Sequence, residues 1–158
     1  MSAIPDRARP VRRGTDNTPV RVQARRRPAV RVARRPGRFR PFANVNANGA
    51  SSSIGVNLNI QDSLVTGNTA SGISATSGSG LAPVNVSVTG TQISGNFGAG
   101  LRADATGGSA IIRVGASMIS ANAAGITTTG VGQVRSFGNN QVNSNGGGEA
   151  FTATDLLK

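Results

Sequence analysis

Residues 58–68 read LNIQDSLVTGN, and this stretch decides the fold because it returns three times along the chain. The later copies are VSVTGTQISGN at 86–96, IRVGASMISAN at 112–122 and RSFGNNQVNSN at 135–145. In the first three copies the first, third and eighth positions are aliphatic, and every copy ends in asparagine. Repeats of roughly 20–50 residues are typical of solenoids, in which each repeat buries its apolar face only by stacking on its neighbours.

The repeats carry the alternation that is typical of short strands. Val56-Asn57-Leu58-Asn59-Ile60 and Val84-Asn85-Val86-Ser87-Val88 alternate apolar and polar residues, which is the period of a half-buried strand. The two columns expected inside the stack are Ile60, Val88, Val114 and Phe137, and Val65, Ile93, Ile119 and Val142. Arg135 falls at an interior position of the fourth copy, unless a one-residue bulge puts Val134 there instead.

Each copy ends in an asparagine at which we expect the chain to turn. Asparagine tolerates the left-handed backbone, and stacked side-chain amides can form a hydrogen-bonded ladder along the coil axis. The predicted turn ladder comprises Asn68, Asn96, Asn122 and Asn145. If Asn48 in an earlier half-copy at residues 45–49 is counted, the asparagines are spaced 20, 28, 26 and 23 residues apart, which suits a three-sided coil.

The repeats resemble those of the right-handed parallel β-helix proteins of the pectin-lyase-like superfamily. The resemblance is carried by the aliphatic positions, the Ser/Thr, Gly/Ala and Asn that follow, and the later pairs Gly72-Ile73, Gly100-Leu101 and Gly125-Ile126. It covers about residues 42–158 and implies an all-β fold, a short right-handed parallel β-helix of four to five coils. A low-complexity Gly/Ser/Asn segment and a β-sandwich of similar strands are the alternatives.

The first 41 residues differ sharply from the rest. They contain 13 Arg, two Asp and six of the seven Pro, and they account for the whole formal charge of +11. Frequent proline and like-charge repulsion predict a disordered basic tail at 1–41, ahead of the repeat domain at 42–158. Three interpretations stay open: an arginine arm that binds polyanions, a solvated extension without a partner, and a start codon placed too early. The polyanion contacts expected of a genuine arm are Arg25, Arg26, Arg27, Arg34 and Arg35.

The chain has no Cys, His, Trp or Tyr, which excludes disulfides, thiol nucleophiles, zinc fingers and histidine-dependent triads. The carboxylates of the repeat domain are Asp62, Asp104, Glu149 and Asp155. Their spacing predicts neither a hydrolytic carboxylate pair nor a calcium site. Arg102 and Asp104 are expected to form an exposed ion pair. Arg113 lies between two inward residues, so we expect it to point outward as a solvated surface arginine, without a partner for the role of a catalytic base.

The sequence therefore predicts a non-enzymatic β-helix repeat protein, either structural or interacting with carbohydrate or a surface, and without cofactor or metal. The expected partner is a polysaccharide or cell-surface glycan, with nucleic acid only if the tail is genuine. The alternatives are a degenerate or partial polysaccharide lyase or hydrolase, and polyanion binding through the arginine arm. No signal peptide or membrane span is readable. The resemblance implies an extracellular or cell-surface bacterial protein if the true N-terminus differs.

Overall fold

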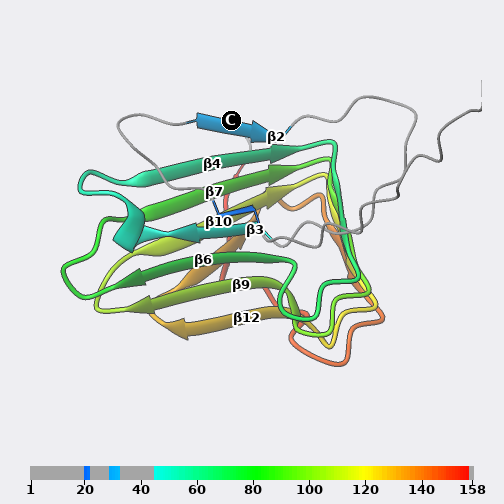
Figure 1. Cartoon of the computed structure of the whole chain (residues 1–158). Coiled ribbons are helices and arrows are strands. Elements are labelled where there is room, and N and C mark those ends of the chain that lie inside the picture. The colour runs from blue at the N-terminus through cyan, green and yellow to red at the C-terminus, as the bar shows by residue number, and fades with distance from the viewer. Residues whose placement is uncertain (1–19, 22–28, 33–44, 157–158) are drawn as a thin grey trace, which may run out of the picture.

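The structure is a computed structural model in which residues 20–21, 29–32 and 45–156 are described. Within these ranges the chain winds into an all-β parallel solenoid of about four turns with almost no helix (Figure 1). The parallel β-helix predicted from the repeats is thereby confirmed. In this part of the chain, no helix is long and apolar enough to cross a membrane.

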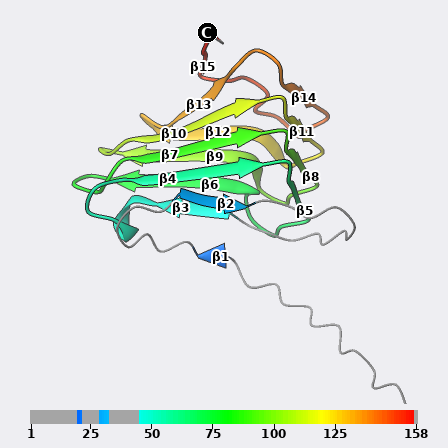
Figure 2. The ribbon, with the colours of Figure 1, turned by 90° about the horizontal axis from the view of Figure 1, so that it is seen from above.

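Each of the first three full turns contributes one strand to each of three parallel sheets, here called A, B and C. The strands of the first three full turns are β4 (Val56–Gln61), β5 (Leu64–Thr66), β6 (Ile73–Gly78), β7 (Val84–Thr89), β8 (Gln92–Ser94), β9 (Ala99–Thr106), β10 (Ala110–Gly115), β11 (Met118–Ser120) and β12 (Ala124–Gly130). The fourth turn contains β13 (Gln133–Ser136) and β14 (Gln141–Asn143), and β15 (Ala153–Thr154) then returns to sheet B beside β13. In spatial order, sheet A contains β6, β9 and β12, sheet B contains β4, β7, β10, β13 and β15, and sheet C contains β5, β8, β11 and β14. Figure 2 shows the turns stacked along one axis.

Two short strands from the Arg-rich segment extend the stack at its N-terminal end. In sheet A, β1 (Val20–Arg21) pairs in parallel with β3 (Val45–Asn48). In sheet B, β2 (Ala29–Val32) pairs in parallel with β4. An exposed strand edge offers unsatisfied backbone groups to other chains, and β2 supplies β4 with a hydrogen-bonding neighbour. The rest of the predicted tail at 1–41 lies outside the described residues.

Inward-facing aliphatic side chains form one continuous core along the stack. Residues in both predicted columns are at most 2% exposed, namely Ile60, Val88, Val114, Val65, Ile93 and Ile119. Val142, in the last turn, is partly covered and packs against the same core. Burial of each such side chain contributes about 1.5–3 kcal/mol, and it depends on the turns above and below.

Strand β13 is shifted by one residue from the predicted column, whereas β14 keeps the predicted register. The register between β10 and β13 pairs Ile112 with Val134, Arg113 with Arg135, and Val114 with Ser136. Val134 and Ser136 are buried, whereas Phe137 is half-exposed. The prediction that Phe137 lies in the core is wrong, and the alternative that puts Val134 inside is confirmed. The shift avoids burying the Arg135 guanidinium in an apolar core, which is strongly unfavourable.

Asn48 does not belong to the asparagine column, and counting it with that column is an error. It pairs with Thr76 in sheet A. Its side-chain Oδ1 accepts a hydrogen bond from the backbone N–H of Ala50 at 2.9 Å and caps the short 3-10 helix η1 (Gly49–Ser51). The pattern Val-Asn-x-Asn-Gly at 45–49 resembles residues 142–146 in sheet C, although β3 lies in sheet A. Strands of all three sheets alternate apolar and polar residues, so this alternation does not identify the sheet.

The corners that follow sheet C require a left-handed backbone. The residues before the four ladder asparagines have positive φ values, +70° at Gly67, +63° at Gly95, +55° at Ala121 and +56° at Ser144. Glycine adopts this region freely, but an L-residue there costs roughly 1–2 kcal/mol. Ala121 and Ser144 are therefore strained where the equivalent glycines are not.

We expect Ala121→Gly to raise the free energy of unfolding by about 0.5–1 kcal/mol. The relief of left-handed strain exceeds the entropy that glycine adds to the unfolded chain. The matched control is Ala123→Gly, also at an exposed site but without a left-handed backbone, which should lower the free energy of unfolding by about 0.5–1 kcal/mol. Urea denaturation measures both. Equal destabilisation by the two substitutions would contradict the corner geometry.

Candidate functional site

The structure brings together the four asparagines Asn68, Asn96, Asn122 and Asn145, one above another at the corner between sheets C and A. Each Nδ2 donates to the Oδ1 of the next asparagine along the chain, at 2.7, 2.7 and 2.9 Å. The backbone N–H of each donating residue reaches the same oxygen at 3.1 Å. The first three are 2–7% exposed, so these bonds satisfy amides that are otherwise costly to bury.

Glu149 lies at the donating end of this ladder. Its Oε1 accepts from the backbone N–H of Asn145 at 3.1 Å and from the Asn145 Nδ2 at 3.4 Å. Because the side-chain amides all donate in one direction, their dipoles reinforce one another, and a carboxylate at the donating end is favourable. Sequence reasoning treated Glu149 only as a carboxylate and missed this contact. The ladder serves the stack and offers no reactive group.

A second polar column, at the corner between sheets B and C, was also missed. The backbone N–H of Thr91 donates to Ser117 Oγ at 3.1 Å, and that of Ser117 donates to Asn140 Oδ1 at 3.0 Å. The Ser117 hydroxyl donates in turn to the carbonyl of Gly115 at 2.8 Å. Each of these residues lies five positions before a ladder asparagine, so the spacing in the sequence was sufficient to find the column.

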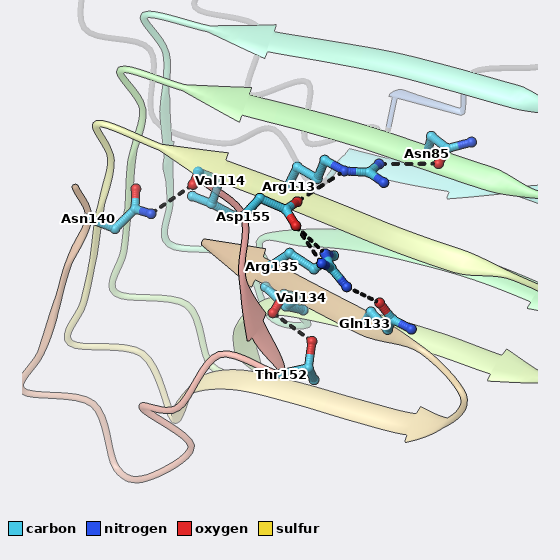
Figure 3. A network of polar contacts seen from close by, with 9 residues as sticks. All are labelled: Asn85, Arg113, Val114, Gln133, Val134, Arg135, Asn140, Thr152 and Asp155. Carbon is cyan, nitrogen blue, oxygen red and sulfur yellow. Dashed lines mark hydrogen bonds and ion pairs between the residues drawn. The ribbon is translucent and has the colours of Figure 1, made fainter. Parts of the chain in front are cut away.

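Two arginines lie side by side on the outer face of sheet B (Figure 3). Arg113 in β10 and Arg135 in β13 occupy paired positions, and their side chains are 37% and 29% exposed. Neighbouring strands are about 4.8 Å apart, so two guanidinium groups in this arrangement repel each other unless an anion lies between them. The one-residue shift of β13 creates this pair.

Asp155, which directly follows β15, supplies this anion. Arg135 Nε donates to Asp155 Oδ1 at 2.8 Å, and Arg135 Nη2 contacts the same oxygen. Arg113 Nε lies 3.4 Å from Asp155 Oδ2. One carboxylate therefore bridges both arginines, and Arg113, which points outward as expected, has an ion-pair partner that the sequence analysis did not identify. The repeat gave no signal for this contact because Asp155 lies beyond the last repeated stretch.

The charges of this cluster favour the ionised carboxylate. The hydrogen bonds from Arg135 hold the pKa of the Asp155 carboxyl below its ordinary value, partial desolvation opposes this, and the positive charges of Arg135 and Arg113 reinforce it. The same hydrogen bonding raises the pKa of Arg135. Asp155 therefore stays ionised and ion-paired over the whole neutral range.

Amide side chains surround the arginine pair. Arg135 Nη1 donates to Gln133 Oε1 at 3.0 Å, and Arg113 Nη1 donates to Asn85 Oδ1 at 3.5 Å. The outward positions of β7 and β4 continue the polar surface, and Ile111 is the half-buried apolar residue among them. We call this surface the amide–arginine face, and it consists of Asn57, Asn59, Asn85, Ser87, Arg113, Gln133 and Arg135.

Residues 152–155, here called the C-terminal strap, hold Asp155 in place. The backbone N–H and the hydroxyl of Thr152 both donate to the carbonyl of Val134 at 2.8 Å. The N–H of Asp155 donates to the carbonyl of Ser136 at 2.7 Å. Figure 3 shows the strap running along β13 with the Asp155 carboxylate turned toward the two arginines. Phe151, just before the strap, packs against the core.

The remaining charged residues lie apart from this face. Arg102 Nε contacts Asp104 Oδ2 at 2.7 Å on sheet A, which confirms the predicted ion pair. Asp62 is exposed at a corner with a left-handed backbone. Among residues 20–21, 29–32 and 45–156, no three acidic side chains gather as a metal site. The arginines predicted to contact polyanions, Arg25, Arg26, Arg27, Arg34 and Arg35, lie outside the described residues.

Comparison with protein-family models, curated proteins and solved structures finds no match to this chain. The coarse fold is therefore assigned on its own geometry, as a parallel β-solenoid.

We expect Asp155→Asn to destabilise the protein near neutral pH and to lose that effect in acid. The folded-state pKa of Asp155 is depressed, so the ion pair stabilises fully above the unfolded-state value of about 3.9, and its contribution disappears as the pH falls through the folded-state pKa. Urea unfolding of both proteins between about pH 7 and pH 2 measures the difference. A difference that stays constant across this range would show that the ionised carboxylate is not responsible.

Proposed function

We propose that the protein is a non-catalytic binding module that holds an extended, carboxylated polysaccharide against the amide–arginine face. The observation that carries this proposal is the arginine pair, two guanidinium groups one turn apart and held in fixed orientation. Planar guanidinium groups recognise carboxylates through paired hydrogen bonds. The asparagine, glutamine and serine side chains around them donate to and accept from sugar hydroxyls.

The face carries an excess of positive charge that attracts an anionic ligand. Its two arginines share one carboxylate, which leaves one net positive charge at the cluster. Arg113 Nη2 makes no hydrogen bond or ion pair with another described residue, and this side chain is the more exposed of the two. The register also aligns Asn59, Ser87 and the two arginines in one row. A polymer running along the stack axis thus meets a polar side chain about every 4.8 Å.

Binding is better supported than catalysis. Asp155 is held ionised between two arginines, which makes it a poor proton donor and a poor general base. Asp104 is paired with Arg102 on sheet A, away from this face. Membership of the pectin-lyase-like superfamily is part of the same proposal, and the repeated motif and the asparagine ladder support it. A location outside the cell follows from that resemblance.

The test is a binding titration with polygalacturonate, with neutral dextran as the control polymer. We expect binding of polygalacturonate only, and a loss of about tenfold for Arg113→Gln, as for a lost hydrogen bond between charged groups. The control is Arg102→Gln, which removes an equal charge from sheet A. Both variants keep the Arg-rich segment, so the affinity of the control includes any non-specific attraction of the polymer to that segment. Equal affinity of the two variants would overturn the proposal. Release of shorter oligosaccharides would favour the lyase or hydrolase alternative instead.

A further inference from the structure

The carboxylate that bridges the arginine pair belongs to the chain itself. It has the same chemistry as the carboxylates that the amide–arginine face is proposed to bind. It reaches Arg135 through Nε and Nη2 and Arg113 through Nε. These are the donors with which the two arginines would hold an external carboxylate in paired hydrogen bonds. The Asp155 carboxylate and a ligand carboxylate therefore cannot occupy this position at the same time.

The C-terminal strap that carries Asp155 is held locally. Its β15 pairs with β13 over only two residue positions. Its further backbone contacts are those of Thr152 and Asp155 with β13. Ala150 before the strap and Leu156 after it are both exposed. Short elements with few buried contacts open at lower free energy than the core does.

Release of the strap leaves the rest of the stack intact. Phe151 lies immediately before the strap and packs against the core rather than against the arginine pair. Val134 on β13 lies in the continuous core, where Ile112 is its neighbour on β10. Displacement of residues 152–155 therefore uncovers one edge of β13 and the two guanidinium groups without opening the solenoid.

We propose that the C-terminal strap is a built-in competitor, in which Asp155 occupies the arginine pair until an anionic ligand displaces it. This inference rests on the proposed function, because it assigns the regulation of the same face. Ligand binding and strap docking are then mutually exclusive. The apparent affinity for ligand equals the intrinsic affinity multiplied by the fraction of molecules in which the strap is released. Weakening the strap raises that affinity, and binding of ligand loosens the strap.

The decisive measurement is residue-resolved hydrogen exchange of the full chain, with and without an oligogalacturonate. We expect the ligand to lower the protection of the Thr152 and Asp155 amides, which donate to β13 in the closed state. The amides of β7 and β10 should keep their protection. An ordinary bound ligand leaves the strap amides unchanged or better protected. Unchanged or increased protection on binding would overturn the competitor proposal.

Substitutions separate failure of this inference from failure of the proposed function. Asp155→Asn should raise the affinity for oligogalacturonate about fivefold or more, and Asp104→Asn, an equal charge change on sheet A, should leave it unchanged. Thr152→Val removes a strap hydrogen bond without a charge change and should also raise the affinity. Binding that depends on Arg113 but is insensitive to both strap variants would refute the competitor alone. No Arg113-dependent binding in any variant would refute the proposed function as well.

Discussion

Every turn of this protein depends on hydrogen bonds with the turns above and below it. The strands of a single turn cannot pair with one another, and the buried asparagine amides find their acceptors in the turns before and after their own. An unsatisfied buried amide costs on the order of 1–3 kcal/mol, so a turn that loses its neighbour loses both this satisfaction and its apolar cover. The register between turns is consequently fixed at all three sheets together.

The fixed register determines what the outer faces display. Outward side chains at one position of successive strands fall into rows, and on sheet B such a row contains Asn59, Ser87, Arg113 and Arg135. Two arginines become neighbours only because β13 is displaced by one residue. That displacement is favoured by the core, which accepts Val134 and excludes the guanidinium group. The packing of the interior thereby creates the charged pair outside.

The sequence was sufficient for the features that repeat. The alternation at Val56–Ile60 and the spacing of the asparagines indicated parallel coils, and the inward positions of the first three copies are buried in the structure. Assignments from the repeat failed at the ends of the stack, where Asn48 and Phe137 were aligned to the columns only by local sequence similarity. They identified no ion-pair partner for Arg113 because the contact with Asp155 joins a strand of the repeat to a segment that does not repeat. Such a contact depends on the path of the chain after the last repeat, and a repeat pattern predicts only the contacts between repeats.

The central claim is that a rigid stack carries the arginine pair while a separable strap covers it. Native-state hydrogen exchange of the ligand-free protein at increasing denaturant tests this most directly. The account predicts that amides of β7 and β10 exchange only through global unfolding, with a steep dependence on denaturant. The Thr152 and Asp155 amides should exchange through local openings at lower free energy, with little dependence on denaturant. Exchange of the strap amides at the same free energy and slope as β10 would contradict the account.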